Sequence, residues 1–537
     1  MKVGSIDGSE ANAAPDTRGA GPIDVGAIGA GPIPGRTVAH GAAWRIAEAI
    51  GGETVALLVF VAMARLLVPE HFGIVALAGV FVAAGQVVLQ QGLPDAVIRT
   101  VDATAAHFAT AFWCNTAFGS ALAGLLALLA LPAAAAFAEP ELAPVLAALA
   151  LGLPLSGAAA VLQAKLVRRM AFKAVALRTL IATTAGGSVG LGLALLGAGA
   201  WALVGLQLTS AVAGLAVLLI MDPWRPRWLV ERRLASELVR FALPVMGTHL
   251  AKFAGKKLDI AVLGLFVPAT ALGHYFLASR LVFALGLATY YAIFALTLPV
   301  LARLDAASPA FRRAAGQALW LTTALCLPAG LGLALTAGPL VPFVFGVVWA
   351  PSTAPLAILA AFSIFYALGL IAGQIMVAAG RPALFLRLTL INTALFLAMV
   401  AAAAPHGLAM AALAGCLANV VMLPAYLLAL RRAIGLELAG LGREQLPLWA
   451  AGGLMVGAIL ALEATLPATL APLPRLAATI AVGLVVYAAA LGLLAPREFT
   501  GVWRGVTGGS TGTAPGRTGA PSTGSGNDPL GAPREAA

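Results

Sequence analysis

Residues 68–78 read VPEHFGIVALA, and 199 residues later residues 267–278 read VPATALGHYFLA. Both segments begin with Val-Pro and then reach a Gly, with one extra residue before the Gly of the second copy. Pro suits the first position of a helix, because the N–H it lacks would have no partner there. Each segment is therefore predicted to open a helix, and the pair indicates an internal repeat.

Long apolar stretches flank both copies. The chain is 61% hydrophobic and 10% charged, whereas soluble domains carry about 25% charged residues. A bilayer-spanning helix needs about 20 apolar residues. Apolar stretches of about this length predict fourteen membrane-spanning helices. Their expected spans are 43–67, 72–92, 107–131, 142–162, 174–196, 200–221, 239–265, 271–301, 316–338, 355–376, 386–403, 407–430, 448–464 and 473–494. The chain is thus predicted to be an all-α integral membrane protein.

The two copies of the repeat are six predicted helices apart, so both enter the membrane from the same side. Such repeats form two parallel bundles around a central cavity. We expect a six-helix bundle over 38–221, a basic cytoplasmic linker over 222–238, a second six-helix bundle over 239–430 and two extra helices over 431–494. The segments 1–37 and 495–537 are rich in Gly and small residues, and we expect disordered cytoplasmic tails.

Basic residues collect on one side of this topology. With the N-terminus in the cytoplasm, the inner loops carry Arg99, Lys165, Arg168, Arg169, Lys173, Arg225, Arg227, Arg232, Arg233, Arg303, Arg312, Arg313, Arg381, Arg387, Arg431, Arg432 and Arg443. The outer side carries Arg475 and, near a helix end, Arg65. This asymmetry is the positive-inside pattern. It predicts a multi-pass protein of a bacterial inner membrane with both termini cytoplasmic.

The net charge of +11 has the sign of a nucleic-acid-binding protein. Its basic residues, however, lie in short clusters between apolar stretches, so we expect no nucleic acid as a partner. The three cysteines lie inside apolar stretches without metal-ligand spacing. We expect no metal and no cofactor. Motifs of a phosphate loop, a zinc protease or a serine hydrolase are absent from the sequence, so we expect a protein that is not an enzyme.

Several ionisable residues fall inside the predicted spans, where each costs several kcal/mol unless it faces a cavity or a partner. Lys252, Lys256 and Asp259 occupy one face of the seventh helix, and Glu53 lies 16 residues before Pro69, as Lys252 does before Pro268. We predict substrate-binding cavity residues and ion-coupling carboxylates from this set. The cavity residues are Lys252, Lys256, Arg280, Arg45 and Arg178; the ion-coupling residues are Glu53, Glu48 and Asp259.

A cluster of Lys and Arg at mid-membrane suits an anionic group such as a phosphate or diphosphate. A lipid-linked sugar carries that group between its polar head and its apolar tail. A desolvated carboxylate titrates nearer neutral pH, so the acids could bind a coupling proton or sodium ion.

Residues 64–73, ARLLVPEHFG, with QGL at 91–93 and AVIR at 96–99, resemble the opening of the polysaccharide transporter branch of the MOP flippase superfamily, the Wzx-type exporters. The segment 162–173, LQAKLVRRMAFK, is similar to the loop between helices four and five of that family. The resemblance covers about 40–500. It implies two six-helix bundles plus two C-terminal helices, with alternating access that flips undecaprenyl-diphosphate-linked oligosaccharide from the inner to the outer leaflet.

The expected partners are a lipid-linked oligosaccharide, membrane lipids and a proton or sodium ion. We expect a monomer that works beside the polysaccharide polymerase machinery. Three alternatives stay open: a lipid II-type flippase or a MATE-like multidrug or cation exporter on the same scaffold, a membrane polysaccharide polymerase or ligase, and a non-transporting scaffold. A cation exporter favours a carboxylate-rich cavity, and a polymerase or ligase favours a long charged outer loop.

Overall fold

The computed structural model describes residues 35–100, 103–222, 224–467 and 471–496, and the side chains of all of these except 35–50, 244, 248, 251–252 and 254–257. Every regular element within these ranges is a helix. The first half holds α1 (Gly35–Leu66), α2 (Pro69–Gln91), α3 (Leu93–Arg99), α4 (Ala105–Ala136), α5 (Leu142–Ala150), α6 (Gly152–Arg168), α7 (Phe172–Leu195) and α8 (Ala200–Met221).

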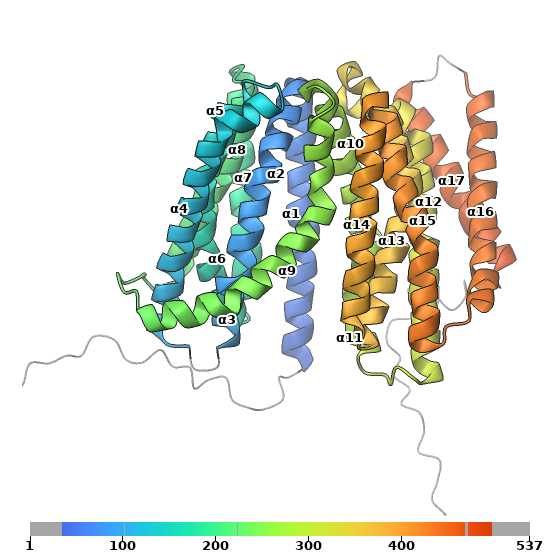
Figure 1. The fold of residues 1–537 in the computed structure, drawn as a ribbon. Coiled ribbons are helices and arrows are strands. Elements are labelled where there is room, and N and C mark those ends of the chain that lie inside the picture. The colour runs from blue at the N-terminus through green and yellow to red at the C-terminus, as the bar shows by residue number, and fades with distance from the viewer. Residues whose placement is uncertain (1–34, 101–102, 223, 468–470, 497–537) are drawn as a thin grey trace, which may run out of the picture.

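The second half follows a similar order and adds two helices. It holds α9 (Arg232–Gly264), α10 (Ala269–Ala288), α11 (Tyr290–Leu301), α12 (Pro309–Phe345), η2 (Val347–Ser352), α13 (Thr353–Ala378), α14 (Pro382–Ala403), η3 (Ala404–His406), α15 (Leu408–Ile434), α16 (Leu438–Thr465) and α17 (Pro472–Leu494). In Figure 1, α4–α8 stand on one side and α12–α17 on the other, with α1, α2 and α10 between them and α9 running obliquely across the front.

The repeat motif lies where the two halves meet. The helices α2 and α10 pack against each other, and each contributes its Gly to the crossing. A Cβ on Gly73 would overlap the carbonyl of Ala269, and a Cβ on Gly273 would overlap the carbonyl of Pro69. The contact is reciprocal, as a two-fold relation between parallel halves requires. Gly is needed at both positions because only a residue without a side chain lets the two backbones approach this closely.

Both central helices are broken at similar positions, 19 residues after Gly73 and 16 residues after Gly273. Gly92 separates α2 from α3 with φ −108° and ψ −89°, and Thr289 separates α10 from α11 with φ −116° and ψ −84°. Broken helices at membrane depth are tolerated where the chain is buried in protein or lines a cavity. The matched breaks extend the internal symmetry beyond the motif that the sequence displays.

Twelve spans in the described residues are long and apolar enough to cross a membrane, so the protein is a multi-pass membrane protein. Ten of them lie before Gly435, and each is a single helix or two consecutive helices. The other two are the C-terminal helices α16 and α17. The first and seventh of the fourteen expected crossings correspond to α1 and α9, which carry most of the intramembrane charges. They are not among the twelve, and the count of fourteen stays a prediction.

The two arginines on the side opposite the basic loops are both engaged locally. Arg65 at the end of α1 donates through Nε to the carbonyl of Val344, 2.6 Å away, near the end of α12. Arg475 at the start of α17 forms an ion pair with Glu463 of α16. The partial negative charge of the last carbonyls of α12 stabilises Arg65, and Glu463 neutralises Arg475.

Candidate functional site

The two halves are joined at the end of the molecule opposite the basic loops. Trp349, in η2 of the second half, donates its indole N–H to the carbonyl of Ala64 in α1 at 2.8 Å. Its ring packs edge-on against Phe72 with centroids 5.2 Å apart, and Phe60 lies 6.1 Å from Phe345. These contacts belong to one buried apolar cluster that draws on both halves. The cluster closes this end of the interface to water.

An ion pair crosses between the halves at a position 11 residues before Ala64 in α1. The carboxylate of Glu53 in α1 lies 2.5 Å from the guanidinium of Arg280 in α10, measured from Oε1 to Nη2. The side chains are 22% and 19% exposed respectively. The guanidinium carbon of Arg280 also lies 5.7 Å from the ring centre of Phe283. A charge placed here without a partner costs several kcal/mol, so each residue neutralises the other.

Arg280 also borders a cavity of about 280 Å³. Helices α1, α2, α7 and α8 of the first half supply most of its wall, and Ile260 of α9 and Phe276 of α10 close it from the second half. The lining is apolar apart from Thr183, Gln207 and Arg280. An apolar pocket with a few convergent polar groups is the usual form of a ligand site. Here the charged group comes from one half and most of the wall from the other.

The side chain of Asp259 in α9 contacts α10. Its Oδ2 accepts a hydrogen bond of 3.0 Å from the hydroxyl of Tyr275, which is buried. Asp259 thus joins α9 to α10 within the second half. Its prediction as an ion-coupling residue rests on its depth and stays a prediction.

Arg178 occupies a different place. Its Nη1 donates to Gln163 Oε1 of α6 at 3.1 Å, and its guanidinium lies against Gly214 of α8. It therefore sits among α6, α7 and α8 of the first half and is absent from the lining of the cavity beside Arg280. Of the predicted site residues with described side chains, the structure brings Glu53 and Arg280 together and holds Arg178 apart.

Four predicted residues lie outside the described side chains: Arg45, Glu48, Lys252 and Lys256. Their positions fall within helices α1 and α9. The packing of the repeat also bears on the predicted equivalence of Glu53 with Lys252. The glycine contacts relate 73 to 273 and 69 to 269, an offset of 200 residues, whereas Pro69 and Pro268 are 199 apart. That offset holds for α2 and α10; α1 ends at Leu66 and α9 at Gly264, which are 198 residues apart, so the equivalence of Glu53 with Lys252 stays a prediction.

Sequence reasoning missed the uncharged polar residues of the cavity, Thr183 and Gln207. Placing an isolated Thr or Gln in an apolar helix costs far less free energy than placing a charge there. Its position in a predicted span therefore does not indicate a cavity. The position of Gln207 in α8 could have been compared with that of Arg178 in α7. Without the rotation of each helix about its axis, however, this comparison does not show which side chain faces the cavity and which faces lipid.

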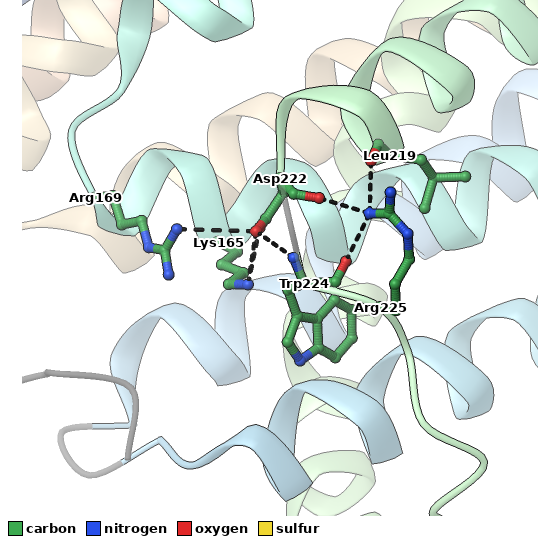
Figure 2. A network of polar contacts seen from close by, with 6 residues as sticks. All are labelled: Lys165, Arg169, Leu219, Asp222, Trp224 and Arg225. Carbon is green, nitrogen blue, oxygen red and sulfur yellow. Dashed lines mark hydrogen bonds and ion pairs between the residues drawn. The ribbon is translucent and has the colours of Figure 1, made fainter. Parts of the chain in front are cut away.

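A second polar cluster lies at the basic-loop end of the first half (Figure 2). Lys165 near the end of α6 approaches Asp222, just after α8, with Nζ 2.8 Å from Oδ2, and the two side chains are 4% and 2% exposed. Asp222 also accepts from the backbone N–H of Trp224 at 3.0 Å, and Arg225 donates to the carbonyl of Leu219 at 2.8 Å. The ammonium lies 4.8 Å from the Trp224 ring centre.

This cluster fixes where the chain leaves the first half. A buried ion pair with good additional hydrogen bonds is tolerated, whereas either charge alone is strongly destabilising. Lys165 and Asp222 therefore hold the end of α8 against α6 and set the direction of the segment that leads to α9. In the sequence, Lys165 is recognisable only as one of the basic residues of the inner loops.

Part of this chain matches the sequences of known proteins. A family model described as "Polysaccharide biosynthesis protein" matches residues 62–354. The succinoglycan biosynthesis transport protein ExoT of Rhizobium meliloti (strain 1021) is 27% identical over 325 residues, which cover 60% of this chain and 66% of that protein. The match thus spans slightly less than two thirds of the relative's own length.

Two solved structures have the same fold. The inward closed conformation of the lipid II flippase MurJ superposes with a TM-score of 0.67 at 12% identity, covering 83% of this chain and 97% of that one. An inward-facing MATE family multidrug resistance transporter of the MOP superfamily gives a TM-score of 0.59 at 16% identity, covering 71% and 94%. At these identities the likeness establishes the fold alone.

Proposed function

The chain belongs to the polysaccharide biosynthesis protein family, and from this premise we propose that it translocates an undecaprenyl-diphosphate-linked oligosaccharide from the inner to the outer leaflet of a bacterial inner membrane. The family, the flippase fold and the multi-pass architecture make it a membrane transporter rather than an enzyme. The cargo, its direction and the membrane are the proposed part. The name of the ExoT relative, a succinoglycan biosynthesis transport protein, supports a polysaccharide precursor as the cargo.

The observation that carries the proposal is the ion pair between Glu53 and Arg280 across the two halves. Arg binds phosphate through two parallel hydrogen bonds. In this conformation the guanidinium is neutralised by Glu53. When a diphosphate enters the adjoining cavity, its oxygens replace the carboxylate as the partner of Arg280. Glu53, released from Arg280, is then the proposed site of the coupling proton or sodium ion.

Alternating access follows from the arrangement of the halves. The bundles 38–221 and 239–430 are proposed to rock about the glycine crossing of α2 and α10, with 222–238 as their linker and 431–494 as an added pair of helices. The aromatic closure around Trp349 seals the side opposite the basic loops. On the positive-inside pattern that side is the outer one, so this conformation is closed to the outside and would receive cargo from the cytoplasm.

A deletion strain tests the proposal. Loss of the gene is expected to accumulate the lipid-linked repeat unit in the inner leaflet, and wild-type protein is expected to relieve it. Arg280→Ala should fail to relieve it although the protein reaches the membrane in normal amounts. The matched control is Arg303→Ala, in the exposed loop before α12. Export restored fully by Arg280→Ala and by Glu53→Gln would remove the proposed site, and a deletion without any accumulation would remove the proposed cargo.

A further inference from the structure

A second and larger cavity of about 970 Å³ lies at the basic-loop end of the second half. The first turns of α12, the loop between α15 and α16, and the start of α16 line it, and Arg313, Glu437 and Glu444 are exposed at its open side. None of the residues that border the cavity beside Arg280 lines it. It is therefore a separate site, and its occupant does not depend on the proposed cargo.

The cavity is lined by charges of both signs. Arg312 and Arg313 project from α12, while Glu437 and Glu444 come from the opposite wall. Within the described part of the chain no ion pair joins any two of these four side chains. Arg312 donates a hydrogen bond from Nη1 to the backbone carbonyl of Ala307 at 2.9 Å. Opposite charges that face one space without pairing suit a ligand that carries both charges itself.

The floor of the cavity holds an unused hydrogen-bond donor. Trp320 lines it, is 8% exposed, and its indole Nε1 has no acceptor among the described residues. A buried donor left without a partner costs about 1–3 kcal/mol, and buried indole N–H groups usually find one. An ester or phosphate oxygen of a bound molecule would satisfy it.

The position along α12 sets the depth. At 1.5 Å per residue, a helix of 37 residues is about 55 Å long, whereas the hydrocarbon core is about 30 Å thick. α12 is thus about 25 Å longer than the core, and a helix centred on the core would place its first turns at the level of the lipid headgroups and Trp320, 11 residues from the start, near the boundary with the acyl chains. Trp is enriched at this boundary in membrane proteins.

We propose that this cavity binds the headgroup of a phosphoethanolamine lipid from the leaflet on the basic-loop side. The phosphate lies between Arg312 and Arg313, the primary ammonium donates to Glu444 and Glu437, and a glycerol ester oxygen accepts from Trp320. A purely anionic headgroup would leave the two carboxylates facing negative charge. A choline headgroup has no N–H to donate, so the site distinguishes primary from quaternary ammonium.

Native mass spectrometry of the whole purified chain tests this assignment. Phosphatidylethanolamine, phosphatidylglycerol and phosphatidylcholine with the same acyl chains are added in turn, and retained adducts are counted. Phosphatidylethanolamine is expected to bind about tenfold more tightly than the other two. Glu444→Gln, Arg313→Gln and Trp320→Phe should each reduce that preference several-fold. Arg303→Gln, outside the cavity, should leave it unchanged.

Equal retention of phosphatidylglycerol, or a preference that survives both Glu444→Gln and Arg313→Gln, would overturn the assignment. Soluble glycerophosphoethanolamine is the arm that separates a lipid from a free phosphate ester. If it binds as tightly as the lipid, the occupant is not a lipid. The measurement needs no transport, so a failure here leaves the proposed cargo untouched, and a failure of the cargo leaves this site untouched.

Discussion

The ion pair between Glu53 and Arg280 gives a quantitative prediction. Two unit charges 4 Å apart interact by about 4 kcal/mol at an effective dielectric constant of 20. The pair lies 2.5 Å apart at its nearest atoms, but each side chain keeps about one-fifth of its surface exposed, so solvent weakens the interaction. We expect Glu53→Gln and Arg280→Gln each to cost about 2–3 kcal/mol, since each leaves the other charge alone.

The double variant leaves no lone charge, so it is expected to lose about 3 kcal/mol of unfolding free energy, which is less than the sum of the two single losses. The two single effects therefore exceed the double effect by about 2 kcal/mol, which is the coupling between the residues. About 450 residues are described, and at roughly 2.1 cal/mol/K per residue the entropy of unfolding is about 1 kcal/mol/K. Each single variant should then lower the melting temperature by about 2–3 °C, and the double variant by about 3 °C.

The assay is thermal unfolding of the purified protein in one detergent, followed by intrinsic fluorescence at a fixed scan rate. Arg303→Gln serves as the matched control and should melt with the wild type. Losses that simply add in the double variant would refute the reasoning, since they would mean that the two residues act independently. A loss for Arg280→Gln alone would likewise place its partner elsewhere.

Three further predictions concern the scaffold. Gly73→Ala should lower the melting temperature by several degrees or abolish folding, because its Cβ overlaps the Ala269 backbone, whereas Gly124→Ala, with nothing within 4 Å, should be neutral in the same assay. Asp222→Asn should lower the yield of folded protein by stranding buried Lys165, at a cost of about 3–5 kcal/mol, and Lys165→Met should restore part of that yield when combined with it. Ala307→Cys should react with a membrane-impermeant maleimide only from the cytoplasmic side, and labelling from outside would invert the proposed topology.

The sequence sufficed for features that follow from the cost of burying polar groups. Apolar spans located the membrane helices, and the cost of an unpaired charge placed Glu53 and Arg280 among the candidate residues, together with Arg45 and Glu48 of α1. Their pairing with each other was not foreseen, because the proline-based equivalence matched Glu53 with Lys252. Which residues face each other across the halves depends on the rotation of each helix about its axis, about 100° per residue, and the sequence pattern does not give that rotation.

Other features had no signal in the sequence. The break at Thr289 lies within an unbroken apolar run, and Thr carries no obligation to end a helix. The pairing of Lys165 with Asp222 joins residues 57 apart in the chain, and both looked like ordinary charges of the loop side. Pairings of this kind depend on which helices become neighbours, and local pattern does not specify that.

Arg280 is proposed to contact the anionic group of a cargo that crosses between the two halves, and transport depends on that contact. Its most direct test is a reconstituted flipping assay, with undecaprenyl-diphosphate-linked oligosaccharide placed in one leaflet of proteoliposomes and its arrival in the other leaflet measured over time. The wild type and Arg303→Ala should move the cargo at the same rate, and Arg280→Ala should fall to the rate of empty liposomes. Cargo moved by Arg280→Ala at the wild-type rate would contradict this role for Arg280.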